Sequence, residues 1–177
     1  LHLSRLFNAV CVLGQSSRAY HIARSYAQYR HAFGNAIITY PLIQEKLAKI
    51  NVENIAMKAA VFAVAALQDQ YDQQKITGED NRLLIRLLVN INKYITSYLA
   101  VRHIHSCIDI LAGNGVIESF SSLPRLLRDC FVCENWEGTH HTLWMQTLRD
   151  IHKYRVDRLF ITHIKQILHP CKNKTYK

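Results

Sequence analysis

The sequence has few of the residues that interrupt helices. Only 6 Gly and 3 Pro occur among its 177 residues, so long helical segments can form with few breaks. No apolar run approaches the roughly 20 residues that a membrane-spanning helix requires, and we therefore expect no membrane span. The chain begins with neither Met nor a signal-like segment, and we expect it to be a part of a longer protein.

The sequence also lacks the cysteine spacing of a disulfide scaffold, because its cysteines are five, an odd number. This favours a reducing intracellular compartment, which is the cytoplasm or, in a eukaryote, the mitochondrial matrix. Cys130 and Cys133 form a C-x-x-C pair, but zinc normally takes four ligands and the redox motif needs a βαβ context that is absent. Neighbouring histidines such as His103 and His105 do not share a helical face. We predict no metal site, and packing roles for both cysteines.

Apolar residues recur at intervals of three and four along most of the chain, which indicates helices. Residues 153–177 are basic and amphipathic, and we expect a last helix there that fades after Pro170. The pattern gives little scope for β-structure. The other predicted helical segments are 3–31, 41–67, a helix capped within 77–80 that ends at 111, a short element at 123–129, and a helix after Thr139.

Long apolar stripes joined by short connections favour an all-α fold, with the helices in an antiparallel bundle. At 177 residues the chain is long enough for one domain with a sizeable core. We assign residues 1–170 to the helical domain and residues 171–177 to a basic tail.

One carboxylate, Glu137, stands between an aromatic residue and the expected start of a helix. Trp136 supplies an apolar wall, Gly138 removes side-chain bulk, and Thr139 can cap the following helix. The positive end of that helix would help to keep the acid ionised. Taken alone, the pattern also fits an ordinary solvated acidic residue near a helix N-terminus, which is the more frequent case. The alternative is a general base.

Two upstream segments, residues 25–50 and 105–120, favour a general base at Glu137 over a solvated acidic residue. They contain R-x-x-F-G from Arg30 to Gly34 and a glycine segment from Gly113 to Gly115. Together with E-G-T at 137–139, these motifs resemble the C-terminal domain of acyl-CoA dehydrogenases, and the resemblance spans most of the chain. It implies a four-helix-bundle type of fold and an FAD-dependent dehydrogenation of an acyl-CoA thioester to trans-2-enoyl-CoA.

The resemblance also implies roles for particular residues near the substrate. Glu137 matches the base that removes the α-proton of the thioester. Some branches of the family carry the base near the position of Ser4, which cannot do that work. Arg5 matches an arginine that lies near the bound thioester, and we assign Arg5, Trp136 and Gly138 to substrate binding.

The cofactor residues implied by the resemblance are Arg30, Phe33, Asp109, Gly113 and Thr139. In relatives the arginine and phenylalanine of R-x-x-F-G touch the pyrophosphate and adenosine half of FAD, often across a subunit boundary. A guanidinium presents forked donors to phosphate, although Arg30 alone would also fit a solvated helix end. Gly113 lets a backbone approach the cofactor closely.

The sequence departs from the family pattern at three positions. Asp109 replaces a glutamine, which removes a donor and adds a negative charge near the dinucleotide. Pro41 stands where many relatives carry Gln, and His141 replaces a glutamine after E-G-T. We therefore expect the cofactor geometry to differ from that of the typical enzyme.

The resemblance implies partners and missing parts as well. Relatives build their active site with an N-terminal helical domain and a middle β-domain, so we expect this chain alone to be inactive. Electrons would pass to an electron-transfer flavoprotein, and the bundle would form a homodimer or homotetramer.

Two alternatives to the enzyme remain open. The formal net charge of +9 would suit nucleic acid, and a DNA-binding alkylation-response branch of the family is faintly similar at Pro41 and N-W-E-G-T. Against this, Lys and Arg are spread along the chain apart from its end, and CoA and FAD are themselves polyanions. The second alternative is an oligomerisation bundle without a cofactor.

Overall fold

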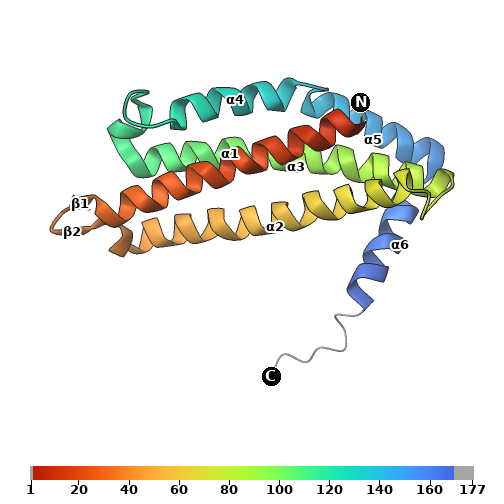
Figure 1. Ribbon diagram of the computed structural model, residues 1–177, viewed down its shortest axis with the longest axis horizontal. Coiled ribbons are helices and arrows are strands. Elements are labelled where there is room, and N and C mark those ends of the chain that lie inside the picture. Colours follow the sequence, from red (N-terminus) through yellow and green to blue (C-terminus); the bar gives the residue numbers. More distant parts are fainter. Residues whose placement is uncertain (1, 170–177) are drawn as a thin grey trace.

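The computed structural model describes residues 2–169, and its fold is all-α. Helices α1, α2 and α3 lie side by side along the long axis, α4 and α5 form a further layer beside them, and α6 projects away (Figure 1). The predicted antiparallel helix bundle is confirmed. The expected tail lies outside the described residues. The helices are α1 (His2–Tyr29), α2 (Pro41–Asp72), α3 (Glu79–Leu111), α4 (Leu123–Asn135), α5 (His140–Tyr154) and α6 (Val156–Leu168), with the 3-10 turns η1 (Ile37–Thr39) and η2 (Ala112–Val116).

Apart from the end of α1, three helix boundaries differ from the sequence expectation. α2 continues to Asp72, five residues beyond the predicted end, and a Gln68–Asp72 side-chain hydrogen bond of 2.9 Å supports this polar last turn. α4 has 13 residues, where only a short element was expected. Arg155 adopts a left-handed conformation with φ 52° and separates α5 from α6, so the last helix starts later than predicted.

A short hairpin, which the apolar pattern of the sequence did not predict, follows α1. Strand β1 (His31–Ala32) pairs antiparallel with β2 (Asn35–Ala36). The two turn residues, Phe33 and Gly34, have φ values of 52° and 92°, as the tight turns of hairpins require. The hairpin ends the first helix two residues earlier than expected.

The core lies where α3 packs against α1, α2 and α4. α1 contributes small residues to this core, and several are completely buried: Ala9, Ala19, Ala23 and Ala27. Small side chains allow the backbones of two helices to approach closely, so α1 and α3 can run side by side for most of their length.

One helix does not fit the expectation that no segment of the chain could span a membrane. Among the described residues, α2 is long and apolar enough to cross a membrane by length and composition, and 28% of its apolar window is buried. The expectation that no segment would reach this threshold is therefore wrong for α2. Such a helix also occurs in bundles, and α2 packs against α1 and α3, which leaves its outer apolar face to be explained.

We expect Ala23→Leu to lower the free energy of unfolding by about 1–3 kcal/mol, because the extra methylenes must enter a close helix contact. Urea denaturation measures the effect. Ala60→Leu on the exposed surface of α2 is the matched control and should change stability by less than about 0.5 kcal/mol. Equal effects of the two changes would contradict the close packing of α1.

Candidate active site

The E-G-T segment forms the turn between α4 and α5. Glu137 and Gly138 both have positive φ values, 60° and 110°, and a non-glycine residue in this region stores strain. Thr139 then begins α5, and its Oγ1 accepts a hydrogen bond of 3.4 Å from the Thr142 amide. The predicted helix cap at Thr139 is confirmed.

Lys93 of α3 holds this turn from inside the bundle. Its side chain is completely buried, and Nζ donates hydrogen bonds of 2.7 Å each to the carbonyls of Glu134 and Gly138. The first carbonyl lies in the last turn of α4, where helix carbonyls lack intrahelical partners and a cation is favoured. Burial lowers the pKa of Lys93 to about 8, so the side chain is an ammonium at neutral pH.

Sequence reasoning missed Lys93, because a lone lysine on a helix is normally solvated. A signal did exist in the sequence. Asn90, Lys93 and Ser97 are spaced by three and four residues and therefore share the inner face of α3, amid an otherwise apolar stripe. Polar residues at this spacing on a buried face indicate an internal hydrogen-bond network.

Arg5 of α1 holds the same turn from a second side. It is 5% exposed, and its Nε donates a 2.9 Å hydrogen bond to the Glu137 carbonyl. Its Nη1 lies 2.7 Å from Asn90 Oδ1 and 2.8 Å from Gln146 Oε1. Gly138 has a φ of 110°, which favours glycine, and a Cβ there would lie 3.3 Å from Arg5 Nη2, so a side chain would press on the guanidinium. Arg5 and Gly138, predicted to bind substrate, thus meet in the support of the turn.

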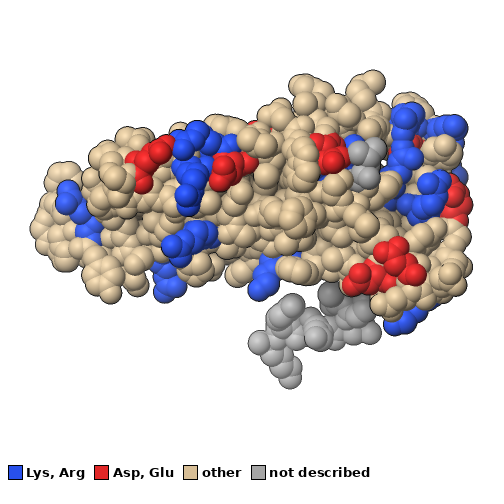
Figure 2. Space-filling view, turned by 45° about the horizontal axis from the view of Figure 1, so that its top comes forward, with Lys and Arg blue, Asp and Glu red and all other residues tan. Residues whose placement is uncertain are grey.

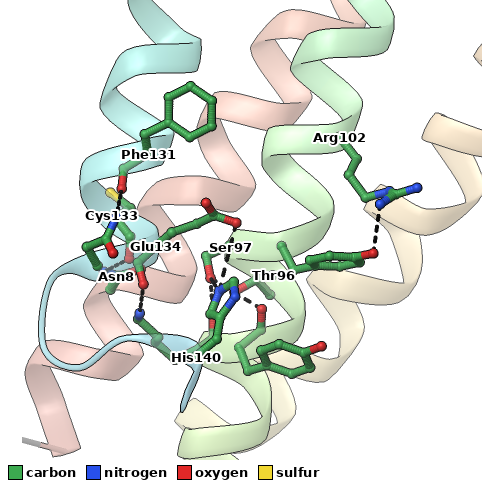
Figure 3. Close-up of polar contacts among 12 residues, drawn as sticks. Asn8, Thr96, Ser97, Arg102, Phe131, Cys133, Glu134 and His140 are labelled. Atoms are coloured by element: carbon green, nitrogen blue, oxygen red, sulfur yellow. Dashed lines mark hydrogen bonds and ion pairs between the residues drawn. The ribbon is translucent and has the colours of Figure 1, made fainter. Parts of the chain in front are cut away.

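Asn8 of α1 adds a third contact at the end of α4. Its Nδ2 donates a 2.9 Å hydrogen bond to the Cys133 carbonyl, and Figure 3 shows Asn8 beside this end of α4. Asn8, Arg5 and Lys93 together satisfy main-chain carbonyls before and within the E-G-T turn.

The main-chain carbonyl of Glu137 is bound by Arg5, whereas the carboxylate of its side chain is not held in this way. Within residues 2–169, its carboxylate has no hydrogen-bond or ion-pair partner, and the residue is half-buried. The Arg5 charge lies near enough to interact with it. Trp136 is 46% exposed, so its predicted role as an apolar wall depends on atoms outside the described chain. The site therefore presents a free carboxylate on a fixed turn.

His140, at the start of α5, lies beside the turn. Its Nε2 is 3.2 Å from Ser97 Oγ and 3.9 Å from Glu134 Oε1 (Figure 3). Burial and the nearby Lys93 charge lower the pKa of His140, and burial raises that of Glu134. These groups do not form a hydrolytic triad, because serine and glutamate approach the same ring nitrogen and Ser97 Oγ donates to the Lys93 carbonyl.

Four of the five predicted cofactor residues lie at the opposite end of the bundle, whereas Thr139 lies in the E-G-T turn. Arg30 and Gly113 line one pocket of about 280 Å³, and a Cβ on Gly113 would meet nothing within 4 Å. Phe33 is 97% exposed at the hairpin tip. Asp109 lines an adjacent groove that also contains Lys46 of α2, and Ile110 lines both this groove and the pocket of Arg30 and Gly113. The glycine that packing requires is Gly115, where a Cβ would lie 2.4 Å from the Ile108 carbonyl oxygen.

The two ends are far apart within one copy. Arg5 lies under the E-G-T turn, and Tyr29, which precedes Arg30, lies 24 residues further along α1. At about 1.5 Å per helical residue this separation is about 36 Å. Glu137 and the Arg30 pocket of the same copy therefore belong to different sites.

A family model described as the acyl-CoA dehydrogenase C-terminal domain matches residues 1–152. The chain belongs to this family. Acyl-CoA dehydrogenase family member 11 of Caenorhabditis elegans is 32% identical over 149 residues, which cover 84% of this chain and 24% of the relative. The putative acyl-CoA dehydrogenase AidB of Escherichia coli (strain K12) is 29% identical over 146 residues, which cover 81% of this chain and 26% of the relative. The chain thus spans about a quarter of these acyl-CoA dehydrogenase relatives. α6 lies beyond the matched region.

Solved structures agree with this family assignment. Caenorhabditis elegans ACDH-11 in complex with C11-CoA has a TM-score of 0.87 and 28% identity, covering 95% of this chain and 28% of that chain. An acyl-CoA dehydrogenase from Bacillus anthracis complexed with FAD has a TM-score of 0.78 and 23% identity, covering 95% and 31%, which shows the fold alone.

We expect the free energy of unfolding of wild type, measured relative to that of Lys93→Met, to rise with pH. The ordinary pKa of lysine is 10.5, and in the folded chain it is about 8. Between these values the unfolded chain binds a proton that the folded chain does not, so wild-type stability rises with pH relative to the variant, by roughly 3 kcal/mol in all. Urea unfolding at several pH values measures this difference.

The experiment compares wild type with Lys93→Met because two buried thiols also affect stability at high pH. Burial raises the pKa of Cys107 and Cys130 to about 12, so wild type and variant alike lose stability as the pH rises above about 9. The subtraction removes this shared loss. A difference that stays constant from pH 7.5 to 10.5 would contradict the lowered pKa of Lys93.

Proposed function

We propose that the protein containing this chain dehydrogenates an acyl-CoA thioester to the trans-2-enoyl-CoA, with Glu137 as the base. The observation that carries the proposal is the contrast at Glu137. Its backbone is held in a left-handed conformation by buried side chains, whereas its carboxylate has no partner within residues 2–169. A strained backbone that presents a free catalytic group is typical of an active site. Membership of the acyl-CoA dehydrogenase family supports the reaction type.

The chemistry assigned to this chain is the removal of a proton. A Glu137 carboxylate oxygen takes the proton from the α-carbon of the thioester, and the electron pair of that C–H bond forms the new double bond as the β-hydrogen leaves with its pair. The guanidinium of Arg5 lies close enough to this carboxylate for the two charges to interact, and Trp136 adjoins it in the sequence.

The residues at the hairpin end fit the family cofactor, FAD. Arg30 is exposed and can donate to phosphate oxygens, and the open space above Gly113 permits close approach of a dinucleotide. Phe33 supports the same interpretation, because an almost fully exposed aromatic ring at a left-handed position gains nothing from its own chain. When bound, the flavin supplies the acceptor for the β-hydride, and electrons would leave to an electron-transfer flavoprotein.

The distance between the two ends supports a homo-oligomer. Since Glu137 and Arg30 of one copy lie about 36 Å apart, each site would combine Glu137 of one copy with the Arg30 pocket of another. A homodimer or homotetramer provides such pairs of ends.

α2 offers a surface for this association, which we call the outer stripe. Its members are exposed and spaced by three and four residues, as in a coiled-coil seam. A two-fold antiparallel pairing about position 57 would place the members opposite one another in three pairs, with a small residue opposite the isoleucine. The pairs are Ala48 with Ala66, Val52 with Phe62, and Ile55 with Ala59.

We expect Glu137→Gln in the full-length protein to reduce acyl-CoA-dependent bleaching of the flavin by roughly 10²–10⁴-fold, because the amide cannot accept the α-proton. Anaerobic absorbance with a panel of acyl-CoA thioesters measures the rate. Flavin content should stay as in wild type. Asp69→Asn, an exposed change on α2, should bleach normally, and a Glu137→Gln protein that also bleaches normally would remove Glu137 as the base.

We expect Ile55→Glu to dissociate the oligomer, because it buries a charge in the middle of the outer stripe. Sedimentation analysis of the full-length protein should show the mass falling to that of a smaller assembly. Lys58→Glu changes the charge of the same helix outside the stripe and should leave the mass unchanged. An unchanged mass for Ile55→Glu would show that other surfaces hold the copies together.

A further inference from the structure

We propose that Lys93 is a positioning residue for Glu137: by binding carbonyls on both sides of it, Lys93 fixes where its carboxylate lies. The inference rests on the proposed function, because it concerns the base of that reaction. It adds a residue that the sequence motifs do not contain and that contacts only the main chain of the site.

The two carbonyls that Lys93 binds lie on either side of Glu137 in the chain. One acceptor, the Glu134 carbonyl, precedes Glu137 by three residues, and the other, the Gly138 carbonyl, directly follows it. Nζ thus bridges the end of α4 and the start of α5 across the two positive-φ residues, 137 and 138. Without this bridge the turn would be free to relax toward the conformations that non-glycine residues prefer.

The environment of Lys93 directs its donors to the turn. The side chain is completely buried, and Nζ donates its two hydrogen bonds within the described chain to these carbonyls. Burying an ammonium is costly unless hydrogen bonds compensate for the loss of water. A leucine on this inner face of α3 would pack without that cost, so the hydrogen bonds to the turn account for a lysine at this position.

The chemistry explains why position matters for a base. Proton abstraction requires the carboxylate oxygen within hydrogen-bond distance of the α-hydrogen, and a displacement of about 1 Å can cost about 10²-fold in rate. Lys93 does not touch the thioester in this account. Its loss should therefore lower kcat for acyl-CoA oxidation and leave KM nearly unchanged.

The test compares Lys93→Met with Thr96→Val in the full-length protein loaded with its flavin. Methionine matches the length of lysine and lacks the donors. Thr96 is buried one turn further along α3, and its hydroxyl bonds only the Asn92 carbonyl of its own helix (Figure 3), so Thr96→Val controls for a general loss of stability. The measurements are flavin bleaching by acyl-CoA below the unfolding temperature and hydrogen exchange of the hydrogen-bonded amides that border the turn, those of Trp136, Thr142 and Leu143.

For Lys93→Met we expect kcat to fall about 10- to 100-fold with KM within twofold, and exchange of the amides of Trp136, Thr142 and Leu143 to accelerate at least about tenfold. Thr96→Val should show neither change. A kcat within twofold of wild type, or a loss confined to KM, would overturn the proposal. So would unchanged exchange of these amides. If Lys93→Met cannot be purified, Lys93→Gln, which keeps one donor group, is measured in the same way.

Failure of the proposed function gives a different result. If wild-type protein is not bleached by any acyl-CoA, the dehydrogenase assignment falls, whereas the exchange experiment still decides whether Lys93 holds the turn. If wild type and Lys93→Met bleach equally while Glu137→Gln does not bleach, the reaction stands and the role of Lys93 is rejected.

Discussion

The candidate site depends on the way in which the end of α4 is satisfied. A helix leaves its last carbonyls without intrahelical partners, and at the end of α4 the carbonyls of Cys133 and Glu134 accept hydrogen bonds from side chains of the bundle. Asn8 and Lys93 bind two of these carbonyls, and Arg5 and Lys93 bind two more in the following turn. The donors come from α1 and α3, which pack closely along their length. The position of the E-G-T turn is therefore set by the core, and a change in the α1–α3 contact would move the turn.

The length of the bundle separates the two groups of candidate site residues within one copy. Long helices without interior proline keep these groups at opposite ends, and the length of α1 fixes the separation between them. In the proposed homo-oligomer, association through the outer stripe of α2 would place one end of a copy beside the other end of its partner. The exposed ring of Phe33 and the exposed apolar face of α2 would then have a common explanation, because the assembly would cover both surfaces.

The sequence predicted the bundle because apolar spacing and the scarcity of glycine and proline act locally, and local effects dominate long helices. It also located the helix start at Thr139 through the capping pattern. It did not predict the hairpin at residues 31–36, since two-residue strands carry no periodic signal, or the break at Arg155, where no glycine marks the left-handed position. The roles of Arg5 and Gly138 in supporting the turn depend on contacts over more than 130 residues, and no local pattern reports such contacts. The assignment of Glu137 came from the resemblance, and its role as the base stays a prediction.

Buried cations are an unusual choice for holding a loop, and the choice has a physical reason here. A neutral donor such as asparagine reaches carbonyls on one side, whereas an ammonium with three donors on a long stem can bridge two carbonyls on different elements. Arg5 adds a rigid fork that divides its donors between the turn and the side chains of Asn90 and Gln146. Because both cations bind main-chain oxygens, they restrain the backbone of Glu137 and leave its carboxylate free. A base must be placed accurately and yet remain unpaired until substrate arrives, and supporting it through the backbone meets both requirements.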